Sequence, residues 1–174
     1  LKLPESTFPR PETSSWAVHG DADTRPNLIT SIYLDPDRHE QHNLRLQEKY
    51  ARMKVEARAE EYLVEDAEIV LTGYGSSSRI ARSAVDRLRS EGIKAGLFRP
   101  VTLSPFPVEQ LNAAVGDHTV LAVEMSNGQY RDDVLLHLDR RSRSEVFLVN
   151  RMGGNLVRVE EVVKAAREKM GVKA

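Results

Sequence analysis

Residues 67–174 show two alternating patterns of apolar and polar positions. Short apolar runs without strict alternation are typical of strands covered on both faces, and they occur at residues 67–74, 93–101, 118–126 and 144–150. Between these runs, apolar residues recur every three or four positions, which predicts helices over residues 77–90, 107–115, 128–139 and 158–170. Strand and helix therefore alternate four times. This alternation predicts an α/β fold, with a mostly parallel sheet and helices on both faces.

The N-terminal region differs in composition, since it is rich in proline and polar residues, and this predicts an extended connector over residues 1–35. Five of the eight prolines lie in it or at its end, namely Pro4, Pro9, Pro11, Pro26 and Pro36. Prolines and the polar residues around them favour extended backbone. ITSIYL, residues 29–34, is the one plausible strand of this connector.

A long charged helix is predicted over residues 36–62, between the connector and an α/β domain at residues 63–174. Asp35 offers an N-cap and Pro36 suits the first helical position. Apolar residues recur at helical spacing along a narrow stripe: Leu46, Tyr50, Met53 and Ala57. We therefore expect this helix to pack by one edge.

Composition narrows the classes of function. The chain has 174 residues, 25 basic against 26 acidic, with the signs interspersed. That balance predicts no nucleic-acid or anionic membrane partner. No apolar stretch approaches the ~20 residues that span a bilayer, and the N-terminus lacks a signal-peptide pattern, so a cytoplasmic location is expected. The chain contains no cysteine, which excludes disulfides, thiolate catalysis and iron–sulfur ligation by its own residues.

The first candidate site is GYGSSSR, residues 73–79. It includes Gly73, Gly75, Ser76, Ser77 and Arg79, and it joins a strand to a helix. Glycines permit a sharp turn, helix N–H groups bind anions and Arg adds a forked donor. However, position 78 is Ser where the dinucleotide fingerprint has its third glycine, and the triphosphate-loop pattern is absent. The alternative is a simple turn in which Ser76 or Ser77 caps the helix.

The second candidate is EMSNGQ, residues 124–129, with Glu124, Asn127 and Gln129 as its polar residues. It follows a predicted strand, and open α/β sheets place ligands or partners at the carboxyl ends of their strands. GYGSSSR is expected at the same edge. The alternative is an Asn-Gly turn beside an exposed Glu124.

The remaining polar clusters predict no site. HEQH, residues 39–42, lacks the H-E-x-x-H spacing and fits a solvated first turn of helix. RRSR, residues 140–143, places cations at a helix end, where they suit the dipole. His118 and His137 have no nucleophile in sequence reach and are interpreted as structural or solvated.

Several stretches together resemble the C-terminal half of the alpha subunit of 2-oxoacid:ferredoxin oxidoreductases. In chain order they are GYGSSSRIARSAV, EGIKAGLFRPVTLSPFP, VEMSNGQYRDDV and NRMGG. The upstream WAVHGD, SIYLDP and HNLRLQEKY segments resemble the connector and long helix that precede that half. WAVHG and LQEKY are most similar to the subunit for branched-chain 2-oxoacids such as 3-methyl-2-oxobutanoate, with the 2-oxoglutarate type as the alternative.

The resemblance implies a domain like the C-terminal domain of transketolase: a three-layer α/β/α sandwich around a five-stranded mixed sheet. Its fifth strand is expected from the N-terminal extension. For the whole complex, the resemblance implies thiamine diphosphate, magnesium and iron–sulfur clusters, with CoA as co-substrate. It also implies beta, gamma and ferredoxin-like subunits as partners and ferredoxin as electron acceptor. The reaction of the family decarboxylates a 2-oxoacid oxidatively to an acyl-CoA.

The departures from the family pattern predict a chain without its own active site. The diphosphate–magnesium motif is absent, since neither Gly20-Asp21 nor Gly116-Asp117 continues it, and no cysteine is present for electron relay. No catalytic, cofactor or metal residue is therefore expected here. The chain is interpreted as one domain of a longer subunit, whose loops at residues 73–79 and 124–129 face neighbouring subunits or the approach of substrate and CoA. A stand-alone anion-binding module is the alternative.

Overall fold

The computed structural model describes residue 9, residues 11–139 and residues 145–171. It divides the chain into two compact units, residues 1–46 and residues 47–174. The predicted RRSR cluster lies outside the described residues.

One five-stranded sheet organises the second unit. Its strands are β1 (Ala59–Tyr62), β2 (Ile69–Thr72), β3 (Ala95–Pro100), β4 (Thr119–Glu124) and β5 (Val146–Asn150), in the spatial order β1-β3-β2-β4-β5. β1 pairs antiparallel with β3, and all other pairs are parallel. The sequence-based prediction of a mostly parallel mixed sheet is confirmed.

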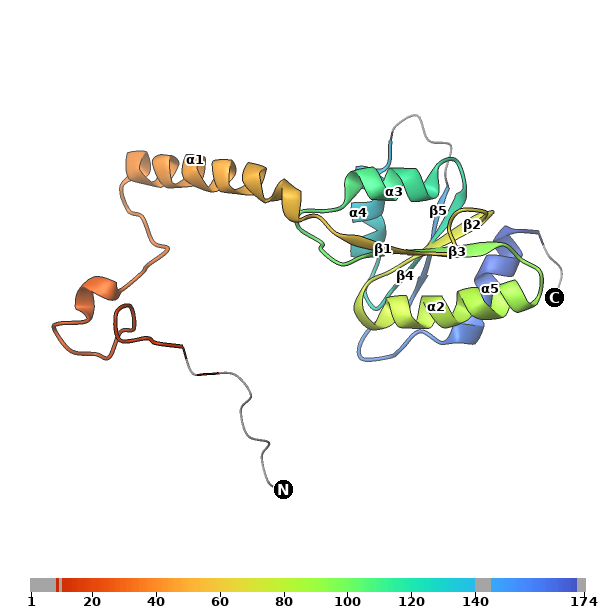
Figure 1. Cartoon of the computed structure of the whole chain (residues 1–174), viewed down its shortest axis with the longest axis horizontal. Helices are drawn as coiled ribbons and strands as arrows, with labels where there is room; N and C mark the ends of the chain where they lie inside the picture. The colour runs from red at the N-terminus through yellow and green to blue at the C-terminus, as the bar shows by residue number, and fades with distance from the viewer. Residues whose placement is uncertain (1–8, 10, 140–144, 172–174) are drawn as a thin grey trace, which may run out of the picture. The chain divides into compact units, whose positions relative to one another are not determined.

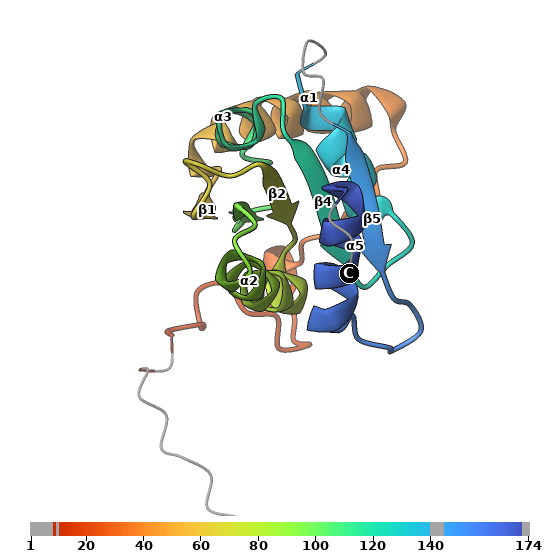
Figure 2. The ribbon, with the colours of Figure 1, turned by 90° about the vertical axis from the view of Figure 1, so that its right-hand side faces the viewer.

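Helices cover both faces of the sheet (Figures 1 and 2). They are α2 (Gly75–Ser90), α3 (Val108–Val115), α4 (Gln129–His137) and α5 (Val159–Lys169). α2 and α5 pack on one face, whereas α3 and α4 pack on the other. The three-layer α/β/α fold class is therefore confirmed. None of the described helices is long and apolar enough to cross a membrane.

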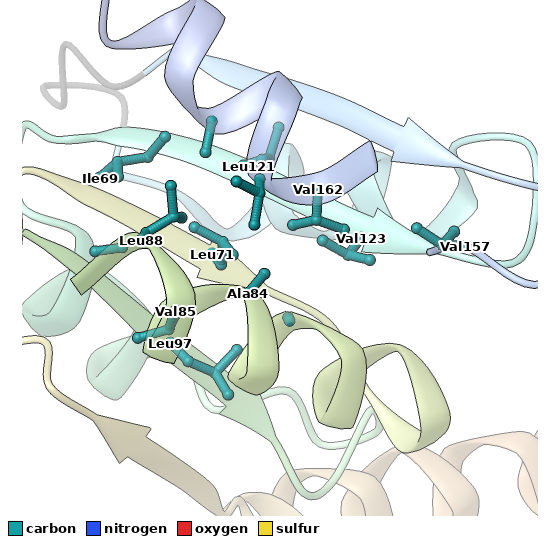
Figure 3. Packing of buried hydrophobic residues seen from close by; sticks show 14 residues of the cluster. Ile69, Leu71, Ala84, Val85, Leu88, Leu97, Leu121, Val123, Val157 and Val162 are labelled. Atoms are coloured by element: carbon teal, nitrogen blue, oxygen red, sulfur yellow. The ribbon is translucent and has the colours of Figure 1, made fainter. Parts of the chain in front are cut away.

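Two apolar cores result, one on each face of the sheet. In the first, Leu71, Leu121 and Val123 of the strands meet Leu88 of α2 and Val162 of α5 (Figure 3). In the second, Phe98 and Val120 pack beneath α3 and α4. Strand side chains point alternately to opposite faces, so β2 and β4 are buried on both sides. This explains why their sequences are continuously apolar.

The predicted helix over residues 36–62 is too long. α1 spans Pro36–Met53, a short 3-10 turn follows at Lys54–Glu56, and residues 59–62 form β1. Hydrogen bonds to the residues after β3 hold this segment as a strand instead of a helix. The Val101 N–H donates to the Arg58 carbonyl at 2.9 Å, and the Arg58 N–H donates to Thr102 Oγ1 at 2.9 Å. The predicted start is correct, since the Arg38 N–H donates to Asp35 Oδ1 at 2.8 Å.

The fifth strand, β1, lies before the predicted α/β domain at residues 63–174, and it is not formed by ITSIYL, the one plausible strand of the connector. Residues 29–34 belong to no helix or strand, because a β-strand requires a neighbour to satisfy its backbone groups. β1 is instead an edge strand with the sequence AEEY. Charged residues are common on edge strands, where they oppose aggregation. Because β1 carries two glutamates, it does not show up in the sequence as an apolar run.

Candidate functional site

The two predicted loops meet at the carboxyl ends of neighbouring strands. β2 and β4 are parallel neighbours. The chain continues from β2 through α2 to β3 on one side, and from β4 through α4 to β5 on the other. The sheet thus reverses its winding between β2 and β4, and open α/β sheets place their binding crevice at this kind of point. The prediction that both loops share one edge is confirmed.

Two contacts and one close backbone approach join the two loops. Thr72 Oγ1 and the Tyr130 hydroxyl lie 2.5 Å apart and are both buried. The Tyr74 ring meets the Tyr130 ring edge to face, with their centroids 5.3 Å apart. A side chain at Gly73 has no room, because a Cβ atom there would stand 2.8 Å from the Val123 carbonyl oxygen. Burial raises the pKa of the Tyr130 hydroxyl, so this group stays protonated and retains its hydrogen bond.

Glu124 supports the β4–α4 loop from inside. Its side chain is 1% exposed, so the alternative of an exposed strand end is wrong. Its Oε1 accepts from the Gly128 N–H at 2.9 Å and from the Ser126 hydroxyl, and its Oε2 accepts from the Arg131 N–H at 2.9 Å. Gly128 precedes α4 with a φ of 99° and has no side chain to cap it. The Glu124 carboxylate therefore supplies the negative group that this helix N-terminus favours.

The other polar residues of this loop are on the surface. Asn127 and Gln129 are both exposed, and the Asn127 N–H donates to Gln129 Oε1 at 2.7 Å.

The start of α2 differs from the predicted capped turn. The helix begins at Gly75, whose φ is +55°, and Tyr74 at the N-cap makes no side-chain capping hydrogen bond. Ser77 is 5% exposed, Ser76 is exposed, and neither serves as the N-cap. Arg79 is exposed and makes no ion pair within the described part of the chain. Helix N-termini favour anions, but the geometry here shows no further group that would define a ligand.

A third loop joins the site and was missed by sequence reasoning. Asn150, at the end of β5, donates from Nδ2 to the Ser126 carbonyl at 2.6 Å. The next residue, Arg151, donates its N–H to the Glu124 carbonyl at 3.3 Å and forms an ion pair with Glu161. The NRMGG stretch carried only the family resemblance. Its place at the end of a strand was the signal that could have added it to the site.

A groove of about 850 Å³ lies elsewhere on the second unit. It is lined by Tyr50 and Met53 of α1, by Pro105 and Phe106 of the β3–α3 loop, and by His137, among others. The His137 ring stacks on Phe106 at 4.5 Å, and its Nδ1 lies 2.7 Å from the Asp133 carbonyl. This agrees with the structural interpretation of His137, while His118 is exposed.

Metal-binding residues do not gather in the described ranges. No group of three or more His, Cys, Asp or Glu side chains is placed to hold a metal ion among the residues that the structure describes. The HEQH histidines instead meet Tyr33, whose ring stacks on His42 at 4.6 Å and on His39 at 6.0 Å.

Solved structures support the class of fold. The structure of 2-oxoglutarate:ferredoxin oxidoreductase from Magnetococcus marinus matches with a TM-score of 0.64 at 23% identity, covering 79% of this chain and 24% of that one. A split-gene transketolase matches with a TM-score of 0.53 at 20% identity, covering 67% of this chain and 42% of that one. The fold is thus that of the transketolase-like domain of these enzymes.

Sequence comparison then identifies the family. Residues 67–162, more than half of the chain, match the model of the pyruvate:ferredoxin oxidoreductase core domain II. The chain belongs to this family. It is also 50% identical over 173 residues to ketoisovalerate oxidoreductase subunit VorB of Methanothermobacter marburgensis, covering 98% of this chain and 48% of the relative. The chain therefore spans about half the length of that relative.

Proposed function

We propose that this chain is the C-terminal domain of the alpha subunit of a 2-oxoacid:ferredoxin oxidoreductase that acts on 3-methyl-2-oxobutanoate and forms an acyl-CoA. In this proposal the beta, gamma and ferredoxin-like subunits are its partners, ferredoxin accepts the electrons and the complex is cytoplasmic. The chain serves subunit assembly and positioning, and the chemistry takes place elsewhere in the complex.

One observation carries the proposal. The 50% identity to the ketoisovalerate oxidoreductase subunit extends over 173 residues, well beyond the core domain at residues 67–162. The similarity therefore includes the connector and α1, which a shared α/β core by itself does not require. That breadth favours the branched-chain substrate over 2-oxoglutarate.

The cofactors implied by the family do not fit the residues of this chain. An iron–sulfur cluster takes cysteine thiolates, and the sequence has none. A magnesium ion beside a diphosphate takes carboxylate ligands, and the described residues gather no such cluster. We therefore assign thiamine diphosphate, magnesium and the clusters to other parts of the complex and derive no catalytic step from this domain.

The loops at residues 73–79 and 124–129 carry the positioning role in this proposal. Arg79 and Gln129 present exposed polar groups toward a neighbouring subunit or toward the approach of substrate and CoA. Glu124 is buried and acts indirectly, by holding the β4–α4 loop in shape.

The substrate is tested with the native complex. Ferredoxin reduction is measured with CoA and each of 3-methyl-2-oxobutanoate, 2-oxoglutarate and pyruvate as substrate. The expected result is the highest kcat/KM for 3-methyl-2-oxobutanoate. A preference for 2-oxoglutarate would move the chain to the alternative subfamily, and reduction with none of the three would overturn the assignment.

The positioning role is tested by Arg79→Ala in the same complex, with Arg79→Lys as the matched control that retains the charge but loses the forked donor. We expect Arg79→Ala to raise KM or weaken assembly. Unchanged KM values and intact assembly would remove Arg79 from the proposal.

Titration of the isolated chain with CoA or phosphate tests the anion-binding alternative, which fails if the amides of residues 73–79 gain no protection from hydrogen exchange.

A further inference from the structure

The N-terminal arm, residues 11–46, exposes large apolar side chains and buries none of its own described residues. The exposed set comprises Trp16, Val18, Leu28, Ile29, Ile32, Leu34 and Leu44. Ile29 is 94% exposed and Leu34 is 93% exposed. Isolated apolar residues on a surface need no explanation, but a concentration of them marks an interaction surface.

The densest part of the arm is LITSIYL, residues 28–34, which we call the apolar segment. It carries no charge and lies between Pro26 and Pro36. Its residues belong to no helix or strand. An uncharged segment rich in isoleucine and leucine is suited to an apolar surface of another protein element.

Local polar contacts hold both ends of the apolar segment in place. On its N-terminal side, Asn27 Nδ2 donates to the Ala17 carbonyl at 3.1 Å. On its C-terminal side, Asp35 caps α1 through the Arg38 N–H, and the Tyr33 hydroxyl lies 3.2 Å from His42 Nδ1. The arm thus orders its backbone while leaving its apolar side chains uncovered. Such preorganisation lowers the entropic cost of binding.

We propose that the apolar segment binds an apolar surface on the part of the longer alpha subunit that this chain does not cover. This inference rests on the proposed function. The binding partner is inferred from the length of the relative. The chain matches the ketoisovalerate oxidoreductase subunit over 173 residues, but it spans only 48% of that subunit. The absence of charge in the segment argues against recognition of a polyanion or a charged surface.

The sequence contains no cysteine, which makes a single-thiol test possible. Leu34→Cys reports on the apolar segment. Leu136→Cys is the control, since Leu136 is 76% exposed on α4 of the α/β domain. Each variant is prepared in the 174-residue chain and in the full-length subunit, and maleimide labelling at the introduced position is followed by peptide mass spectrometry.

In the 174-residue chain, both thiols are expected to react at the rate of a free surface cysteine. In the full-length subunit, Cys at position 34 is expected to react at least about tenfold more slowly, because labelling then requires local opening. Equal rates at position 34 in the two proteins would overturn the inference. Protection that appears in the 174-residue chain and grows with its concentration would assign the segment to a second copy instead, and would also overturn it.

A separate measurement distinguishes failure of this inference from failure of the proposed function. The intact mass of the native subunit and the identity of its co-purifying chains test the proposed function directly. A long subunit with oxidoreductase activity and an unprotected position 34 would leave the function standing and remove only the docking of the apolar segment.

Discussion

Gly73 and Glu124 determine the shape of the turns at the carboxyl ends of β2 and β4. Gly73 allows the β2–α2 turn to approach the β4 backbone closely, since any Cβ atom would meet the Val123 carbonyl. The buried Glu124 carboxylate accepts hydrogen bonds from two backbone N–H groups and one hydroxyl. Both residues were selected from the sequence for their motif positions, and the structure buries both of them.

Substitution Gly73→Ala is expected to destabilise the domain by about 1–3 kcal/mol, the usual cost of overpacking a filled site. The clash is with backbone, which cannot rotate away as a side chain would. Gly75→Ala is the comparison, because nothing lies within 4 Å of a Cβ atom there and only its φ of +55° is strained. Urea unfolding followed by circular dichroism gives both values. A Gly73→Ala protein as stable as the wild type would contradict the packing described here.

Glu124→Gln is expected to destabilise the domain by about 1–3 kcal/mol, because an amide NH2 replaces one acceptor and leaves a donor facing a donor. The exposed Glu65 supplies the control, since Glu65→Gln should stay within about 0.5 kcal/mol of the wild type. Hydrogen exchange of Gly128 and Arg131 gives a local readout. Unchanged protection of these two amides in Glu124→Gln would show that the carboxylate does not hold them.

Among the helices, α2 and α5 act as one layer. Val85 and Leu88 of α2 and Val162 of α5 share the same core, and an ionic contact joins the helix ends. Arg167 Nε donates to Glu91 Oε2 at 2.9 Å, and Arg87 lies 3.6 Å from the other Glu91 oxygen. The hydrogen bond from Arg167 is the main cause that lowers the pKa of Glu91 below its usual value of 4.5.

Glu91→Gln is therefore expected to lower Tm at pH 7, and its Tm difference from the wild type is expected to shrink as the pH falls. A lowered folded-state pKa means that the charged carboxylate stabilises the fold above its unfolded pKa of 4.5, and that this stabilisation is lost as the pH drops through the lower folded value. Calorimetry of both proteins between pH 7 and pH 3 measures the effect. A Tm difference that stays constant over this range would exclude the ion pair as its cause.

At the scale of the whole molecule, the two units contribute differently. Every buried residue described for the two apolar cores lies between residues 67 and 166, whereas the described part of the arm contains no buried residue. Both cores are therefore built without a buried residue from the arm.

Deletion of residues 1–46 is expected to leave a cooperatively folding domain with a Tm within about 4 °C of the complete chain, which corresponds to ~1 kcal/mol for a domain of this size. Deletion of residues 159–174 is the comparison that is expected to lower Tm strongly, because it removes α5 and its part of the first apolar core. Differential scanning calorimetry compares the three proteins. A large loss of Tm on removal of residues 1–46 would show that the arm packs on the domain.

The sequence by itself determined the α/β class, four of the five strands and the helices that follow them, because these elements are buried on regular faces and their apolar periodicity records that burial. It also placed the two loops at one edge, since parallel strands share their carboxyl ends. Only the tertiary structure decided the end of α1 and the identity of the fifth strand. AEEY has no apolar pattern of its own, and it becomes a strand because the edge of β3 offers it a hydrogen-bonding neighbour.

The same distinction holds for the candidate site. Motif positions selected Gly73, Glu124 and Gln129, but sequence spacing does not record which groups are buried together. The Thr72–Tyr130 hydrogen bond spans 58 residues and the Asn150–Ser126 hydrogen bond spans 24. These contacts exist because parallel pairing brings the ends of β2, β4 and β5 side by side, which is a property of the folded sheet and of no single stretch of the chain.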